Sequence, residues 1–209
     1  MKRSRSARLQ QHGALLLEAL ISILICAFGL LGFAGMQVRA TSAEFESYQR
    51  SQALVLIEDM ASRLNANRAE ASAYGGASLI GRDVSEPAVC PAGVSAAEPK
   101  LCNCAPLTGA NHDLCEWGNL LRGSAETRNG VKVGAMFNAR GCISKPVSAT
   151  DRYVIAIAWQ GINRTGAPAS ACGKDDAAFP TEPLRRVVSS VVCIGSLADP
   201  AVAPVTPRC

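Results

Sequence analysis

The feature that most constrains this chain is an apolar run near its N-terminus, Gly13–Val38, which reads GALLLEALISILICAFGLLGFAGMQV. Within it, Ala19–Val38 is a stretch of 20 residues without a charge. At ~1.5 Å per residue a helix of that length measures about 30 Å, the thickness of a bilayer's hydrocarbon core. One carboxylate, Glu18, stands near the start, where it costs a few kcal/mol or more in lipid unless it has a partner.

Positive charges precede the run, and the first 13 residues contain no Asp or Glu. The four basic residues are Lys2, Arg3, Arg5 and Arg8. This bias predicts that the N-terminal end stays in the cytoplasm and that everything after the run lies across the membrane. Removing these four from the 21 Lys and Arg leaves 17, which equals the 17 Asp and Glu. Since no basic excess remains, we expect no nucleic-acid partner.

Three interpretations of the run compete. A cleavable secretory signal could end near Val38-Arg39-Ala40, but the run is longer than the usual apolar region of ~7–15 residues and contains Glu18. A plain single-span anchor fits the length and leaves Glu18 unexplained. The third interpretation starts from the order of features: a basic leader, Gly13, then an apolar helix whose fifth residue is Glu18. That order resembles the N-terminal signal of type IV prepilins.

The resemblance implies that prepilin peptidase cuts between Gly13 and Ala14, that Ala14 is N-methylated and that the apolar helix is retained. The family usually has Phe after the Gly, and Ala14 departs from that pattern. The new α-amino group, with a pKa of ~8, is mostly positive. Glu18 of a neighbouring subunit can pair with it, a contact worth roughly 4 kcal/mol at ~4 Å and an effective dielectric of ~20, before desolvation is subtracted. We expect this pair to set axial register more than stability.

The nine cysteines predict a disulfide framework. Cys26 lies inside the apolar run, where it is most simply an apolar residue of the span. An even number, eight, follows the run, as in proteins of oxidising compartments. Eight cysteines allow 105 pairings, so the connectivity stays open. These disulfide candidates are Cys90, Cys102, Cys104, Cys115, Cys142, Cys172, Cys193 and Cys209.

A metal or catalytic site is the alternative use of these residues. Cys102, Cys104, His112 and Cys115 could be imagined as zinc ligands, but their spacing departs from the usual C-x2–4-C pairs. His112 is the one histidine after the leader, and it falls at an expected helix start, where a surface polar residue is ordinary. We therefore expect no metal, no cofactor and no catalytic residue.

A long helix is expected to continue beyond the run. Arg39–Ser72 contains no Pro or Gly, and Leu54, Ile57, Ala61 and Leu64 recur at helical spacing. One helix from about Ala14 to about Ala73 follows, ended by Gly75-Gly76. Its first half would lie in a membrane or filament core, and its second half would pack on a domain. Three glycines in the first half either allow close helix packing or loosen the helix: Gly29, Gly32 and Gly35.

The remaining chain predicts a loop, a short helix and a sheet. Gly76–Gly109 is rich in Pro, and Asn111–Leu121 reads as a helix capped by Asn111 or Asp113, with an apolar face that includes Trp117. An antiparallel meander is expected to follow, with a long loop at Gly161–Pro183. Its predicted strands are Gly130–Asn138, Gly141–Lys145, Tyr153–Gln160 and Leu184–Ile194. Trp117 and Trp159 are expected in the core, and Arg122, Arg185 and Arg186 in solvent.

This order of elements resembles the type IV pilin architecture. The expected class is α+β: a long N-terminal helix, membrane-spanning in its first half, packed on an antiparallel sheet in a disulfide-rich head. The expected domains are a cleaved leader (1–13), a transmembrane or filament-core helix (14–38), the second half of that helix (39–73) and the head (74–209). Within the family the head resembles minor pilins, through Asp113–Trp117 (DLCEW), Arg140–Cys142 (RGC), the strand YVIAIAWQG and the later RRVV.

The resemblance implies a structural subunit without catalysis, which helps prime pilus assembly and sits at or near the pilus tip. Its implied partners are prepilin peptidase, other minor pilins, the major pilin and a tip adhesin. The implied location is the inner membrane of a Gram-negative bacterium, single-pass with the head in the periplasm, and then the extracellular pilus. Two alternatives stay open: a pseudopilin of a type II secretion system, and a membrane-anchored adhesin or ligand-binding module without a filament role.

Overall fold

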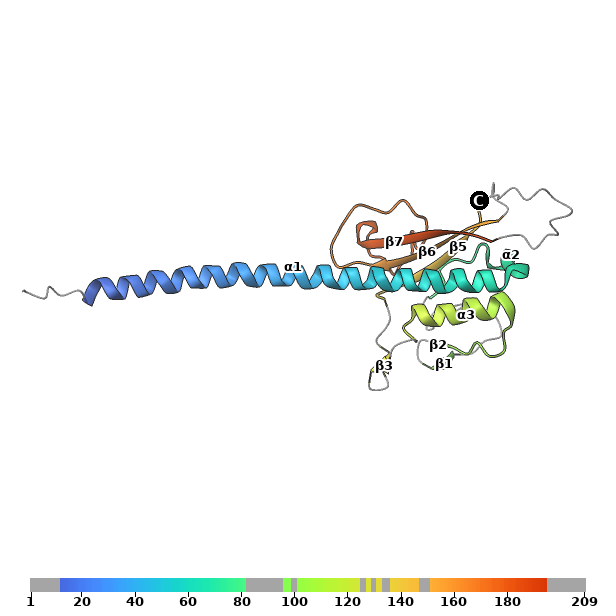
Figure 1. The fold of residues 1–209 in the computed structure, drawn as a ribbon, viewed down its shortest axis with the longest axis horizontal. Coiled ribbons are helices and arrows are strands. Elements are labelled where there is room, and N and C mark those ends of the chain that lie inside the picture. Colours follow the sequence, from blue (N-terminus) through green and yellow to red (C-terminus); the bar gives the residue numbers. More distant parts are fainter. Residues whose placement is uncertain are drawn as a thin grey trace, which may run out of the picture. The chain divides into compact units, whose positions relative to one another are not determined.

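The fold begins with a long helix, α1, which runs from His12 to Ala66 (Figure 1). The computed structural model describes residues 12–81, 96–98, 101–124, 127–128, 131–132, 136–146 and 151–194. The chain divides into two units, Met1–Phe45 and Glu46–Cys209. We call them the helical unit and the globular unit.

The predicted helix is wrong in its last turns, because α1 ends at Ala66 and not near Ala73. A 3-10 turn, η1 (Arg68–Glu70), and a single helical turn, α2 (Ala71–Tyr74), follow it. The helix is interrupted at Asn67, whose side-chain amide donates hydrogen bonds to Asp113 Oδ2 (2.6 Å) and to the Tyr74 hydroxyl (3.1 Å). Such tertiary bonds outweigh a local helix propensity of a few tenths of a kcal/mol per residue.

A three-stranded antiparallel sheet forms the other main element of the globular unit. Its strands are β5 (Arg140–Ser144), β6 (Arg152–Gln160) and β7 (Arg185–Cys193), in the order β5-β6-β7. The full length of β7 pairs with β6, from Arg152 opposite Cys193 to Gln160 opposite Arg185. The predicted meander and its last three strands are confirmed to within a residue at most ends.

Two small strand pairs accompany the sheet. β1 (Ala96–Glu98) pairs with β2 (Leu101–Cys102), and β3 (Thr127–Arg128) pairs with β4 (Val131–Lys132). The predicted strand Gly130–Asn138 is therefore wrong in extent. Its C-terminal end is a turn, where Asn138 adopts a φ of 55°, a left-handed conformation that a strand does not allow.

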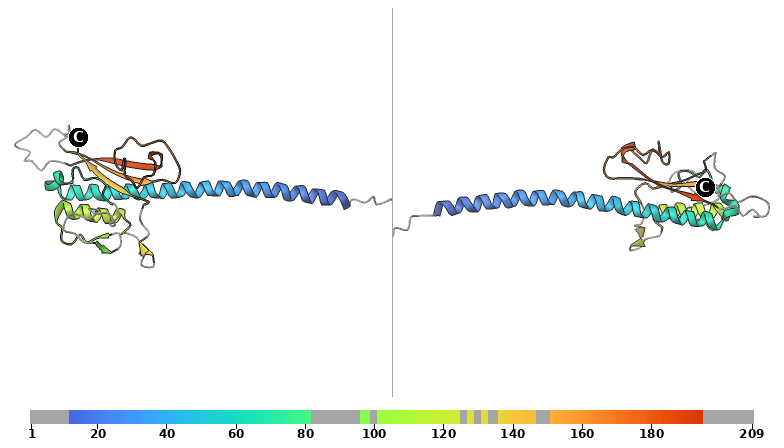
Figure 2. Two further views of the ribbon diagram at one scale, coloured as in Figure 1. Left: turned by 180° about the vertical axis from the view of Figure 1, so that it is seen from behind. Right: turned by 45° about the horizontal axis from the view of Figure 1, so that its top comes forward.

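The core of the globular unit lies where the second part of α1 runs between the sheet and helix α3 (Gly109–Leu121), as Figure 1 shows and Figure 2 shows from behind. The predicted apolar face of α1 is rotated slightly, since Leu54 is 48% exposed. Each large apolar side chain buried here contributes roughly 1.5–3 kcal/mol. The main members of the cluster are Ala53, Leu56, Ile57, Met60 and Leu64 of α1, Trp117 and Leu121 of α3, and Tyr153, Ile155, Ile157 and Trp159 of β6.

Helix α3 starts earlier than predicted, and neither Asn111 nor Asp113 caps it. Instead, the Ala110 N–H donates to Glu70 Oε2 at 3.1 Å, so a carboxylate from η1 satisfies one free donor of the first turn. The preceding residue, Gly109, has a φ of 58° and would place a Cβ 2.2 Å from the same carboxylate oxygen. Glycine is therefore required at that position.

Candidate functional site

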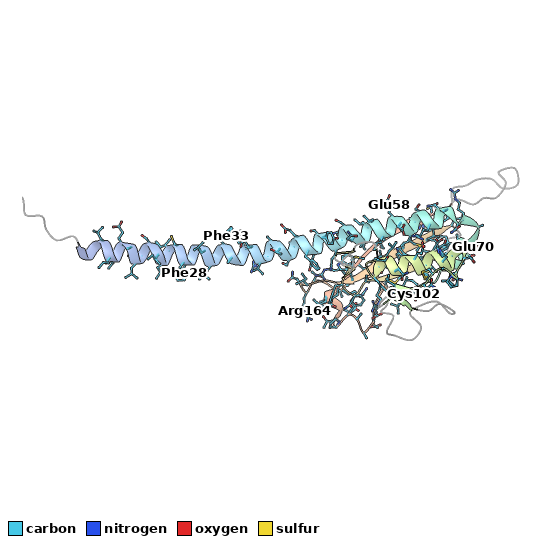
Figure 3. The ribbon with its side chains drawn as sticks, turned by 90° about the horizontal axis from the view of Figure 1, so that it is seen from below. Phe28, Phe33, Glu58, Glu70, Cys102 and Arg164 are labelled. Carbon is cyan, nitrogen blue, oxygen red and sulfur yellow. A yellow bond between two sulfur atoms is a disulfide. The ribbon has the colours of Figure 1, made fainter. Side chains whose placement is uncertain are left out.

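The helical unit presents large apolar side chains on every side. One helix in the described part of the chain is long and apolar enough to cross a membrane, judged by length and composition. Figure 3 labels Phe28 and Phe33, which project from it. An apolar surface of this extent marks an interaction with lipid or protein. Its large side chains are each at least 50% exposed: Leu15, Leu16, Leu17, Leu20, Ile21, Ile23, Leu24, Ile25, Phe28, Leu30, Leu31, Phe33, Met36 and Val38.

Glu18 stands in this apolar surface as an exposed residue of α1. Its main-chain carbonyl accepts a hydrogen bond of 2.8 Å from the Ser22 hydroxyl. Its carboxylate makes no hydrogen bond or ion pair with any residue that the structure describes. Gly13 and Ala14 lie in the first turn of the same helix, and residues 1–11 lie outside the described part. A partner for this carboxylate must therefore be sought outside the described residues.

Disulfides hold the globular unit, as the sequence predicts. Cys104 pairs with Cys115, and Cys142 pairs with Cys172. The first pair removes two of the imagined zinc ligands. Cys102 and Cys193 are disulfide-bonded as well, whereas Cys26 is free. Cys90 and Cys209 lie outside the described residues.

The long loop between β6 and β7 is fastened to the sheet by buried charges. Arg140 Nε donates to Asp176 Oδ2 at 3.1 Å, and both side chains are almost fully buried. On the same loop, the Cys142–Cys172 disulfide joins the middle of β5 to residue 172. The loop is thus held by one covalent link and one buried ion pair.

Arg185 is a further anchor, and the prediction that it lies in solvent is wrong. Its side chain is fully buried, and its Nη1 donates to the carbonyl oxygens of Ser170 (2.8 Å) and Cys172 (2.7 Å). Its Nη2 donates to Glu182 Oε2 at 2.5 Å, a hydrogen bond that lowers the pKa of Glu182. The planar guanidinium matches several fixed acceptors at once, which explains why it is buried rather than solvated.

Glu46, the first residue of the globular unit, binds the start of the same loop. Its Oε1 accepts hydrogen bonds of 3.2 Å from the main-chain N–H groups of Ile162 and Asn163. Arg186 Nη2 donates to the same oxygen at 3.2 Å. The side chain of Arg186 is only 14% exposed, so this residue too is less solvated than predicted.

A polar network joins α1 to α3. Arg63 donates to Asp59 (2.8 Å), Glu116 (2.6 Å) and Asp113 (3.3 Å). Burial by itself lowers the pKa of Arg63, but the hydrogen bonds and charges of Glu116 and Asp59 raise it above its ordinary value. The guanidinium therefore stays charged and binds the two helices together.

The same network explains why three clustered ligand-type side chains do not amount to a metal centre. Ligand atoms of His112, Asp113 and Glu116 lie within 4.8 Å of one another. Arg63 already supplies the positive charge between the two carboxylates. Asp113 Oδ2 is also occupied, because it accepts hydrogen bonds from Asn67 and from the Tyr74 hydroxyl. The arrangement is that of a structural junction.

Comparison with known proteins gives one match. Residues 35–115 match the family model Tt1218-like, described as type IV pilin Tt1218. The matched stretch begins in the apolar run and ends at Cys115 of α3, so it contains all of α1 after Ala34 and its junction with α3. No curated protein and no solved structure matches the chain. The match covers 81 of the 209 residues, and over that stretch the chain is similar to type IV pilins, which are structural subunits. The long N-terminal helix and the antiparallel sheet fit the α+β pilin fold.

Proposed function

We propose that this chain is a minor type IV pilin, most similar to the PilV type. The observation that carries the proposal is Glu18, a carboxylate without a partner among the described residues, in a fully exposed apolar helix that leads into the pilin-like stretch 35–115. An isolated carboxylate in lipid or in a filament core is costly, and a positive charge from another subunit offsets that cost.

The proposed partner charge is the new N-terminal amine of a neighbouring subunit. Prepilin peptidase cuts between Gly13 and Ala14, and the amine of Ala14 is then N-methylated. While the chain waits in the inner membrane of a Gram-negative bacterium, its globular unit lies in the periplasm. Together with other minor pilins it primes assembly of the major pilin, at or near the tip and beside a tip adhesin.

N-terminal mass analysis of the mature protein tests the processing step. The expected mature chain begins at Ala14, with the mass of one methyl group added. An intact Met1, or a start after Ala40, contradicts the proposal. A Gly13→Leu variant provides a matched control, since it should stay unprocessed while the globular unit folds normally.

Substitution of Glu18 tests its role in assembly. Glu18→Ala should be processed normally, yet its incorporation into pili should fall at least tenfold, because the amine of the neighbouring subunit loses its partner. Glu44→Ala removes the same charge from an exposed position of α1 beyond the apolar run, and it should assemble like the unchanged chain. Equal incorporation of the two variants contradicts the pairing role.

Two other functions are distinguished by the genes encoded beside this one and by whether the protein is found in pili. A pseudopilin of a type II secretion system would be encoded beside secretion components, whereas a minor pilin is encoded beside other minor pilins and a large adhesin. A membrane-anchored adhesin without a filament role would be absent from sheared pili. Glu18 favours a filament subunit over that last alternative, because a simple anchor needs no carboxylate in its apolar run.

A further inference from the structure

Two large apolar side chains are exposed at one end of the sheet in the globular unit. Phe137 is 58% exposed and Ile162 is 53% exposed. Both flank the C-terminal end of β6: the Gln160 N–H donates to the Phe137 carbonyl at 2.9 Å, and Ile162 follows Gln160 by two residues. The two side chains therefore occupy the same end of the sheet, which we call the Phe137 edge.

The Phe137 edge carries a positive charge. Arg164 is exposed and lies at the rim of the globular unit (Figure 3). Within the segment 161–169, GINRTGAPA, it is the only charged residue. Among the described residues Arg164 makes no ion pair. Apolar groups beside an unpaired guanidinium are the combination that binds the head-group layer of an anionic membrane.

The chain itself limits how far this edge can lie from the apolar run. The main-chain N–H groups of Ile162 and Asn163 are bound to Glu46, and Glu46 follows Val38, the last residue of the uncharged stretch, by eight residues of α1. Eight residues of helix rise about 12 Å. The head-group layer extends roughly 5–8 Å beyond the hydrocarbon core. The segment that connects this edge to the apolar run is therefore short, comparable with the depth of that layer plus one extended side chain.

We propose that the Phe137 edge is a lipid contact, on which the globular unit rests while the chain is anchored in an anionic bilayer. Phe137 and Ile162 enter the head-group layer, and Arg164 binds lipid phosphate. The inference rests on the membrane-anchored stage of the proposed function. The hydrogen bonds from Ile162 and Asn163 to Glu46 hold the loop in a fixed orientation, so the contact needs little ordering when it forms.

The test places a fluorescent reporter on the edge of the full chain. Phe137→Trp is reconstituted into vesicles of phosphatidylethanolamine and phosphatidylglycerol whose acyl chains carry bromine, which quenches nearby indoles. The native Trp117 and Trp159 are buried in the core, so the unchanged chain supplies the background. The matched control is Val191→Trp, which is 57% exposed on β7 opposite Val154. That position is six residues along the strand from Gln160, or about 20 Å.

The expected result is at least twofold stronger quenching of Phe137→Trp than of Val191→Trp. Replacing phosphatidylglycerol with phosphatidylcholine should weaken the quenching, and Arg164→Gln should remove this dependence on lipid charge. Equal quenching at positions 137 and 191 overturns the inference. A blue shift of Phe137→Trp in sheared filaments, without quenching in vesicles, also overturns it and assigns the edge to a neighbouring subunit.

Flotation of the same vesicles separates the inference from the function on which it rests. If the chain fails to float with the lipid, the membrane-anchored stage is wrong and both proposals fall. If the chain floats and position 137 is not quenched, the lipid contact alone is wrong. Urea unfolding of Phe137→Trp, which should match that of the unchanged chain, confirms that the reporter sits on an intact globular unit.

Discussion

The indole N–H of Trp117 on α3 donates a hydrogen bond of 2.8 Å to the main-chain carbonyl of Leu56 on α1. The side chain of Trp117 is fully buried, and its ring lies directly over Gly141 of β5, where an added Cβ would come within 2.2 Å of ring carbon Cζ3. One side chain thus connects the long helix, the second helix and the sheet. This contact requires a residue without a side chain at position 141.

Gly141→Ala should therefore destabilise the globular unit. The new methyl group forces the Trp117 ring from its place, at a cost of about 2–3 kcal/mol in the free energy of unfolding. Urea unfolding of the detergent-solubilised chain, followed by tryptophan fluorescence, measures this cost. Gly166→Ala is the control, because nothing lies within 4 Å of the added Cβ there, and it should change stability by less than about 0.5 kcal/mol. Equal stabilities for the two variants contradict the packing described here.

Tyr74 should make the globular unit sensitive to alkali. Burial, and then the hydrogen bond to Asp113, raise the pKa of Tyr74 to about 12 from an ordinary 10. As the pH rises past 10, the unfolded chain loses this proton first, so the unfolded state gains stability until the folded tyrosine also ionises near pH 12. The free energy of unfolding should fall by about 2 kcal/mol across that interval.

Tyr74→Phe isolates this effect from the other groups that titrate in alkali. The variant should be less stable than the unchanged chain at pH 7 by about 1 kcal/mol, because Asp113 loses one donor. It should then lose less stability between pH 10 and pH 12. Parallel curves for the two proteins across this range would show that Tyr74 does not ionise as described.

Arg185→Lys should be costly, although it preserves the charge. Lysine has three donors on a point charge and cannot reproduce the planar fork that reaches Ser170, Cys172 and Glu182 together. Leaving buried carbonyl groups without donors costs about 1–3 kcal/mol each, so we expect a loss of at least 2 kcal/mol. Arg152→Lys, at an exposed position of β6, should be neutral in the same urea experiment. Similar effects of both changes would mean that Arg185 does not hold the loop.

The sequence predicts those parts of the fold whose signals are local. The β-branched and aromatic residues of YVIAIAWQ predict β6, and Gly75-Gly76 predicts where the helical segment stops. The features that it misses depend on partners far along the chain. Asn67 interrupts α1 because of Asp113, 46 residues later, and the start of α3 is set by Glu70, 40 residues earlier.

The candidate site divides in the same way. Gly13, Ala14 and Glu18 stand out because their spacing lies within six residues of the chain. Glu46 carries no such signal, since its partner Arg186 is 140 residues away and a charged residue on a helix is ordinary. Arg185 was expected in solvent because arginine usually is, and its acceptors are carbonyl groups that no residue pattern reveals.

The Cys142–Cys172 disulfide should stabilise the long loop between β6 and β7 more than the Cys104–Cys115 disulfide does. Its ends are 30 residues apart, against 11 for the other, and chain-entropy estimates give about 3–4 kcal/mol for loops of such lengths, with the longer loop gaining more. The disulfide also lies beside the buried Arg140–Asp176 ion pair, so we expect this ion pair to weaken when the disulfide is removed.

Limited trypsin digestion of two variants, each with both cysteines of one disulfide replaced by Ser, provides the measurement. The variant without Cys142–Cys172 should be cut at Arg164 and Lys174, which are exposed in the loop but held in place by its anchors, at least tenfold faster than the unchanged chain. The variant without Cys104–Cys115 should be cut there at the original rate, and equal acceleration in both would show that the disulfides act on the whole unit rather than on this loop.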